Sequence, residues 1–222
     1  MILCQEGIRK LENMSKEKKK RELVAELISL FYWKKAFDII QQVLCRVYSA
    51  KIKRKILNCG NNFRLSGSIN IRGEQYMIIG NNFSAGDSLI LQCWDKYEGI
   101  QYTPKLHIGN NVYLGKDCHI GCINEIIIGD NFLTGSNVYI TDHGHGEGTL
   151  FECSISPLKR KLSSKGKVEI GNNVWVGNNV VILPNVMIGN NVTIGANSVV
   201  TKDVPDNTIV AGVPAQIIRF KQ

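Results

Sequence analysis

The chain has 222 residues, of which 44% are hydrophobic and 8% aromatic. This length accommodates one domain with an appendage, and the apolar fraction is sufficient for a hydrophobic core. The formal net charge is +8, and all of the excess positive charge lies in the first 60 residues. No run of about 18 uncharged apolar residues is present, which excludes a helix that spans a membrane.

Cysteine usage points to a reducing compartment. The seven cysteines are an odd number and lack the spacing of a disulfide framework or a zinc ribbon. Reduced and mostly buried thiols are therefore expected. No apolar segment precedes Lys16–Lys20, so we expect no signal peptide and a cytoplasmic location.

Residues 1–58 are predicted to form a basic, amphipathic helical extension. Residues 1–20 are charged and featureless, whereas the following part has apolar residues at helical spacing and contains neither Gly nor Pro. A helix or a broken pair of helices is expected from about Lys18 to Ile56. Its apolar stripe consists of Leu23, Leu27, Leu30, Phe37, Ile40, Leu44 and Val47.

Two roles for this extension are open at this point. The helix could pack on the end of the following domain or on a sister subunit, since the terminal coil of a solenoid needs a cap. Alternatively, Tyr32 and Trp33 beside Lys34, with the basic cluster at 51–55, favour peripheral contact of residues 16–56 with anionic lipid at the inner face of the plasma membrane. Nucleic acid is not expected as a partner, because no recognition motif accompanies the charge.

Residues 59–222 are predicted to form a β-solenoid. An aliphatic residue returns at every sixth position over one long stretch, and Gly follows it four times: Ile170, Val176, Ile182, Ile188, Ile194, Val200. Neither a helix nor an ordinary strand has this period, whereas a solenoid does. Three hexapeptides would form one triangular coil, with the aliphatic residue inside. Gly or Asn would take the corners, where φ can be positive.

The six-residue pattern is interrupted twice before this stretch. The first coils, from about Cys59, are irregular, and the insertion at 94–105 is predicted to be a loop. A second, polar and basic loop at about 141–168 has no pattern of its own, which is typical of functional or disordered segments. A last partial coil and a short tail end the chain. Regular positions between the two interruptions are Ile108, Leu114, Ile120, Ile128, Thr134 and Ile140.

Two motifs resemble the hexapeptide-repeat acyltransferase superfamily over residues 60–220. They are ITDHGHG and SSKGKVEIGNNVWVGNNVVILPNVMIGNNVTIGANSVVTKDVPDNTIVAGVPAQIIR. The resemblance implies a mainly β fold, the left-handed parallel β-helix, in a homotrimer. The loop motifs are most similar to bacterial O-acetyltransferases of capsule, colanic acid and O-antigen biosynthesis. An acetyl-CoA co-substrate, a carbohydrate acceptor and no metal are the corresponding expectations.

His143 is the candidate general base, because imidazole titrates near neutral pH and an alcohol needs a base to attack a thioester. The resemblance matches His143 to the family's catalytic histidine, which deprotonates an acceptor that attacks acetyl-CoA directly. Asp142 and His145 are candidates to orient or assist the imidazole. Contact between Asp142 and its neighbour His143 requires a turn, since adjacent side chains in a strand point to opposite faces.

The donor site is expected along the regular coils. In the family, pantetheine runs in a groove between two subunits and contacts small residues. By resemblance, matching positions are Trp175, Gly177, Gly195 and Ala196, while Thr201, Lys202 and Arg219 match residues that meet the CoA phosphates. The family often has a further basic residue where this chain has Gln216.

Other activities also remain open. A γ-class carbonic anhydrase uses the same fold with three zinc-binding histidines, but the spacing of the four histidines here does not favour it. A β-helix scaffold without catalysis is a second alternative, and serine or antibiotic acetyltransferases are further acceptor classes. His107 and His119 are expected to face outward and have no assigned role.

Overall fold

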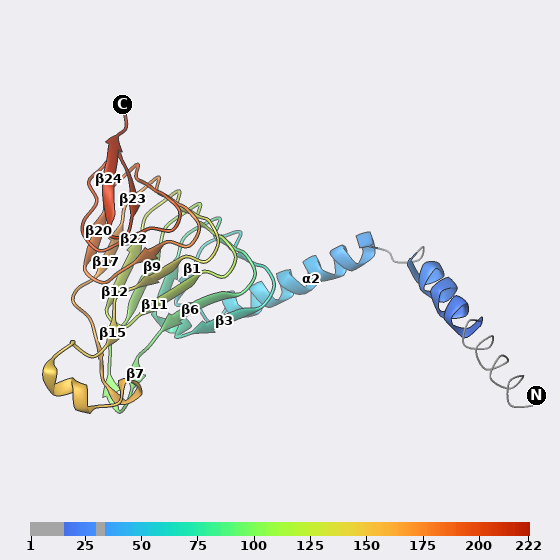
Figure 1. The fold of residues 1–222 in the computed structure, drawn as a ribbon, viewed down its shortest axis with the longest axis horizontal. Helices are drawn as coiled ribbons and strands as arrows, with labels where there is room; N and C mark the ends of the chain where they lie inside the picture. Colours follow the sequence, from blue (N-terminus) through green and yellow to red (C-terminus); the bar gives the residue numbers. More distant parts are fainter. Residues whose placement is uncertain (1–15, 30–33) are drawn as a thin grey trace, which may run out of the picture. The chain divides into compact units, whose positions relative to one another are not determined.

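The computed structural model describes residues 16–29 and 34–222 (Figure 1). The chain divides into two compact units, Met1–Val43 and Leu44–Gln222. Expectations for residues 1–15 and for the aromatic pair Tyr32 and Trp33 fall outside the described part.

The described part of the extension contains two helical stretches. Residues 16–29 are helical, and α2 follows at Lys34–Lys53. The last turns of α2 bury Ser49 and Ile52, and the backbone N–H of Leu65 donates a hydrogen bond of 2.9 Å to Ser49 Oγ. These turns therefore cover the first coil of the following domain. None of the helices in the described ranges combines the length and the apolar character needed to cross a bilayer.

Residues 58–220 form a left-handed parallel β-helix with three sheets, as predicted. The first sheet contains β1 (Asn58–Cys59), β4 (Met77–Ile79), β9 (Lys105–Ile108), β12 (Glu125–Ile128), β17 (Val168–Ile170) and β20 (Val186–Ile188). The second contains β2 (Arg64–Leu65), β5 (Ser84–Ala85), β10 (Tyr113–Leu114), β13 (Leu133–Thr134), β18 (Trp175–Val176), β21 (Thr193–Ile194), β23 (Thr208–Gly212) and β24 (Ala215–Phe220). The third contains β3 (Ile69–Arg72), β6 (Leu89–Cys93), β11 (His119–Cys122), β14 (Tyr139–Thr141), β19 (Val181–Ile182) and β22 (Val199–Val200).

The core consists of the residues that the six-residue period selects. Val176 pairs with Ile194 and Ile182 with Val200 in the parallel ladders, so each coil advances by 18 residues in this region. All six predicted positions between Ile170 and Val200 are buried. A continuous column of aliphatic side chains thus replaces the single core of an ordinary domain.

Asparagine and glycine have different tasks at the corners. The positive φ belongs to asparagines, for example 57° at Asn173 and Asn179, and not to the glycines that follow the buried aliphatic residues. Gly171 instead gives clearance, because a Cβ there would lie 2.8 Å from the carbonyl carbon of Gly189 in the next coil. In these coils asparagine therefore takes the left-handed corner, one of the two residue types expected there, and glycine lets consecutive coils approach.

Both interruptions of the period, and the tail, have secondary structure of their own. The 94–105 insertion is a hairpin of β7 (Lys96–Tyr97) and β8 (Ile100–Gln101), where a loop was predicted. The 141–168 segment contains an antiparallel pair of β15 (Gly144–His145) and β16 (Leu162–Ser163), with 3-10 turns Leu150–Ser154 and Pro157–Lys159 between them. The tail forms β24, which pairs antiparallel with β23.

Candidate active site

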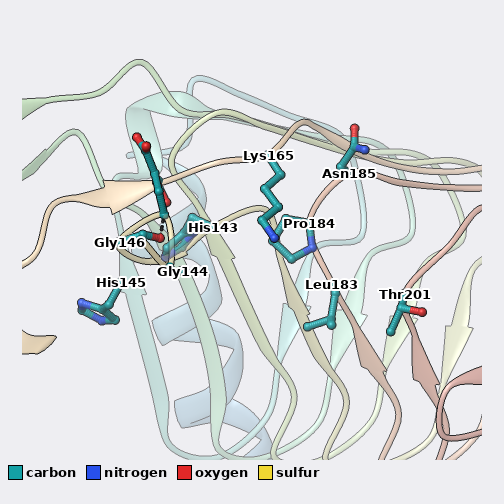
Figure 2. Close-up of a pocket in the computed structure, with 12 residues that line it drawn as sticks. His143, Gly144, His145, Gly146, Lys165, Leu183, Pro184, Asn185 and Thr201 are labelled. Atoms are coloured by element: carbon teal, nitrogen blue, oxygen red, sulfur yellow. Dashed lines mark hydrogen bonds between the residues drawn. The ribbon is translucent and has the colours of Figure 1, made fainter. Parts of the chain in front are cut away.

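A cavity of about 610 Å³ lies at the corner of the prism that follows β14, β19 and β22 (Figure 2). These three strands are neighbours in one sheet, so the segments that leave them stack at the same corner. The cavity is lined by residues 143–148 and 183–185, by Thr201, and by Ser163 and Lys165 from the end of the 141–168 segment.

Asp142 and His143 form a hydrogen-bonded pair at this corner. The Asp142 side chain is fully buried, and that of His143 is 12% exposed. His143 Nδ1 lies 2.9 Å from Asp142 Oδ1, which also accepts the backbone N–H of Ile123 at 3.0 Å. The chain bends at Asp142, directly after β14, which brings the two neighbouring side chains together.

This arrangement selects one tautomer of His143. An ionised carboxylate only accepts hydrogen bonds, so Asp142 holds the proton on Nδ1 and leaves Nε2 as a free base. The second carboxylate oxygen accepts the backbone N–H of Asn124 at 2.8 Å and lies 3.4 Å from Cys122 Sγ. Backbone amides of the preceding coil thus fix the position of the Asp142 carboxylate.

The Cys122 thiol contributes to the same network. Its hydrogen bond with Cys93, its burial and the nearby charge of Asp142 all raise the pKa of Cys122. The thiol therefore stays protonated and donates to Asp142. Cys122 lies on β11, so two consecutive coils hold the Asp142 carboxylate.

His145 has a different environment from His143. Its side chain is exposed, and its ring meets the edge of Tyr97 at a centroid distance of 5.4 Å. It lines the same cavity as His143, and Figure 2 shows both histidines on one turn of the chain. Of the two candidates to orient the His143 imidazole, Asp142 therefore makes the contact with its ring. His145 packs against Tyr97 of the inserted hairpin instead.

Glu152 stabilises the turn that follows the two histidines. This role was not predicted from the sequence. Its buried carboxylate accepts the backbone N–H groups of Glu147 and Gly148, both at 2.8 Å, and of Thr149 at 3.1 Å. These bonds, led by the one from Glu147, lower the pKa of Glu152. The spacing of Thr149 and Glu152 is that of a capping box, and both of its bonds are present. This spacing could have revealed the turn.

The two interruptions of the β-helix are joined to each other. Tyr97 of the hairpin donates a hydrogen bond of 2.7 Å to the carbonyl of Leu158. Tyr102 Oη accepts the backbone N–H of Leu162 at 3.0 Å. Figure 1 accordingly shows β7 near β15, at the same corner of the prism. The hairpin thus supports the segment that carries His143.

The predicted donor residues do not gather in a single copy of the chain. Thr201 lines the cavity with His143, and Lys202 follows it. The remaining candidates belong to the second sheet or directly follow its strands: Trp175, Gly177, Gly195, Ala196 and Arg219. Trp175 is 55% exposed there.

Two of these donor candidates also have a packing explanation. A Cβ on Gly177 would lie 2.6 Å from the backbone nitrogen of Ala196, and one on Gly195 would lie 2.8 Å from Ala211 Cβ. Close approach of coils therefore accounts for both glycines without a ligand, and their role in donor binding stays a prediction.

The described part of the chain contains free cysteines and no assembled metal site. Six cysteines are free in this part of the chain, and three of them are buried: Cys93, Cys118 and Cys122. No group of three or more His, Cys, Asp and Glu side chains assembles as a metal site within the described ranges.

Family models and known proteins match the β-helix. The "bacterial transferase hexapeptide (six repeats)" model matches residues 167–202, and the "hexapeptide repeat of succinyl-transferase" model matches residues 105–142. A putative lipopolysaccharide biosynthesis O-acetyl transferase, WbbJ of Escherichia coli K12, is 39% identical over 153 residues, which cover 67% of this chain and 74% of that protein. Galactoside O-acetyltransferase of the same organism is 41% identical, over 53% of this chain and 55% of its own length.

Solved structures agree with this assignment. A galactoside acetyltransferase in complex with coenzyme A has a TM-score of 0.51 and 29% identity, and the match covers 78% of this chain and 69% of that one. A maltose O-acetyltransferase from Clostridium difficile 630 shares the fold, with a TM-score of 0.52 and 24% identity over 83% of this chain and 88% of that one. The repeated hexapeptides, the three-sheet coil and the extent of these matches show that the chain belongs to the hexapeptide-repeat acetyltransferase superfamily.

Proposed function

We propose that the protein transfers an acetyl group from acetyl-CoA to a hydroxyl group of a sugar, in the assembly of a surface polysaccharide. The observation that carries the chemistry is the Asp142–His143 pair, in which Asp142 is buried and His143 lines the cavity. The acceptor class is supported by relatives named for lipopolysaccharide biosynthesis and for galactoside acetylation.

The proposed reaction is a direct transfer. His143 Nε2 takes the proton of the acceptor hydroxyl as its oxygen attacks the thioester carbonyl. The C–S bond then breaks, and the imidazolium returns the proton to the departing thiolate of CoA. Asp142 stabilises the imidazolium between these two proton transfers, because its buried carboxylate lies 2.9 Å from Nδ1.

Substitution of the base tests this function directly. His143→Ala should lower kcat by roughly 10²–10⁴-fold, the usual contribution of a general base. Asp142→Asn should lower kcat by about 10²-fold or more, since an amide does not select the Nδ1 tautomer. Transfer of acetyl from acetyl-CoA to sugars is the measurement. Near-normal turnover in His143→Ala would refute the assignment, and loss in His145→Ala alone would move the base to that residue.

The donor is proposed to meet Lys202 and Arg219 with its phosphates, and Trp175, Gly177, Gly195 and Ala196 with its pantetheine arm. Lys202 is exposed beside the cavity-lining Thr201. Lys202→Ala should raise the KM for acetyl-CoA about 10-fold and change the KM for the acceptor little, because only one charge-assisted contact is lost. An unchanged KM for acetyl-CoA would contradict the phosphate role.

The proposed assembly is a homotrimer whose active sites are shared between copies. It is supported by the separation of His143, which follows a strand of the third sheet, from Trp175 on the second sheet. The mass of the particle in solution should be three times the 24.8 kDa chain. Mixed and reassembled His143→Ala and Trp175→Ala chains should regain activity, because some sites then receive both intact residues. A fully active monomer would contradict this proposal.

We propose that the enzyme is cytoplasmic and that the basic extension binds it to anionic lipid at the inner face of the plasma membrane. Four basic residues lie at or just after the end of α2: Lys51, Lys53, Arg54 and Lys55. Phe37, Ile40 and Leu44, in the first half of the same helix, are exposed. The full chain should sediment with phosphatidylserine vesicles and not with phosphatidylcholine vesicles. Replacement of these four residues by Gln should weaken sedimentation at least 10-fold, and binding that persists unchanged would contradict the proposal.

A further inference from the structure

The outer face of the third sheet places a second imidazole close to His143. His119 is the first residue of β11, and it pairs in register with Tyr139 of β14, four residues before His143. Because Ile120 points into the core, His119 and Gly121 share the outer face of β11.

The absence of a side chain at Gly121 lets both imidazoles border one position. A Cβ on Gly121 would lie 3.2 Å from His143 Cε1 and 3.7 Å from His119 Nε2. Cε1 lies between the two ring nitrogens, so the His143 ring borders the outer surface of β11. A larger residue at 121 would occupy this space.

The neighbouring strands surround this position with polar and aromatic groups. Gly121 pairs in register with Gln92 of β6 and Thr141 of β14. Gln92 Oε1 accepts a hydrogen bond of 3.2 Å from Trp94 Nε1. The Trp94 ring lies under the Arg72 guanidinium, at 4.0 Å from its centroid. Such a surface combines amide groups with aromatic faces, which suits a ligand that is both hydroxylated and partly apolar.

The His119 ring is oriented and electrically neutral. It packs edge-on against Tyr139, with centroids 5.0 Å apart and planes inclined by 61°. Partial burial, followed by the charge of His143, lowers the pKa of His119. His119 therefore stays neutral when His143 takes up a proton, and it offers one donor and one acceptor nitrogen. The imidazoles of His119 and His143 can therefore each bind one of two neighbouring hydroxyl groups of a sugar.

We propose that His119, with Gly121 as the floor, is a binding subsite for the sugar acceptor, in which His119 hydrogen-bonds a hydroxyl adjacent to the one that reacts. This subsite rests on the proposed acetyl transfer and goes beyond it, because it names the residue that fixes which hydroxyl meets His143. A purely structural alternative is that His119 only packs against Tyr139.

Two substitutions separate hydrogen bonding from packing. His119→Phe keeps a ring against Tyr139 and removes both nitrogens, whereas His119→Gln keeps a donor and an acceptor. His107→Phe is the matched control, since His107 is also half-buried on an outer face but lies on β9 in another sheet. The assay uses the free hexoside that the wild-type enzyme acetylates fastest, with the unfolding midpoint as a check on folding.

His119→Phe is expected to lower kcat/KM for the sugar at least 10-fold, mainly through KM, with the KM for acetyl-CoA and the unfolding midpoint unchanged. His119→Gln should recover part of this loss, and His107→Phe should match the wild type. An unchanged kcat/KM in His119→Phe, or an equal loss in His119→Phe and His119→Gln, overturns the subsite and leaves acetyl transfer intact. If the wild type acetylates no sugar, the proposed function itself fails, and the subsite fails with it.

Discussion

The regular coils and the two interruptions are stabilised in different ways. Between residues 167 and 202 each contact recurs in the next coil: aliphatic side chains stack inside, and asparagine amides bridge at the corner, as between Asn179 and Asn197 at 2.9 Å. In the 141–168 segment the polar contacts have no equivalent in a neighbouring coil, as for those of the Asp142 and Glu152 carboxylates. The repeated contacts stabilise all coils in the same way. The unrepeated contacts fix the conformation of the 141–168 segment beside the cavity.

The largest effect on stability is expected from the coil interior. Ile182 is fully buried on β19. Ile182→Ala should lower the free energy of unfolding by about 2–5 kcal/mol, because the cavity left behind lies between two coils that cannot collapse onto it. Denaturant unfolding measures the change. A loss below about 1 kcal/mol would show that the coils tolerate gaps in their core.

Glycines in the two regions should respond differently to the same added methyl group. In Gly177→Ala the new Cβ would lie 2.6 Å from the backbone nitrogen of Ala196, so one coil must shift, at a cost of about 1–3 kcal/mol. Gly144 in the interruption has nothing within 4 Å of the same position, and Gly144→Ala should cost less than about 0.5 kcal/mol. Equal costs in the two variants would remove this distinction.

A smaller effect is expected at the asparagine corners. Asn179 has φ of 57° and bridges Asn137 and Asn197 through its amide, at 2.9 Å on each side. Asn179→Ala should destabilise the protein by about 1–2 kcal/mol, through left-handed strain and lost hydrogen bonds. Asn179→Gly keeps the backbone conformation and isolates the amide contribution. If Ala and Gly are equivalent, backbone strain does not contribute.

The smallest global effect is expected from Glu152. Glu152→Gln should leave the denaturant midpoint of unfolding nearly unchanged, while hydrogen exchange at the amides of Glu147 and Gly148 accelerates. The pKa of Glu152 is lowered in the folded protein. Its stabilisation of the turn is therefore complete above the pKa of the unfolded chain, about 4.3, and is lost as the pH falls through the folded value. Exchange in Glu152→Gln should lack this acid-dependent step.

The sequence singled out His143 and Asp142 as candidates, but it did not reveal the geometry of the pair. The motif ITDHGHG placed His143 and Asp142 at the end of a coil, and the requirement for a turn between them followed from strand geometry. The sequence carried no sign that backbone groups at Ile123 and Asn124, one coil earlier, bury and satisfy the Asp142 carboxylate. The assignment of catalysis to His143 stays a proposal that the substitutions above test.

The solenoid could be predicted from the sequence, because it repeats one local rule: a buried aliphatic residue, then glycine and asparagine, every six positions. How the exceptions to that rule combine depends on tertiary contacts. The contact from Tyr97 to Leu158 spans 61 residues, and Gly121 brings His119 near His143 through the pairing of two strands. Such contacts depend on which coils become neighbours in space, so no local period encodes them.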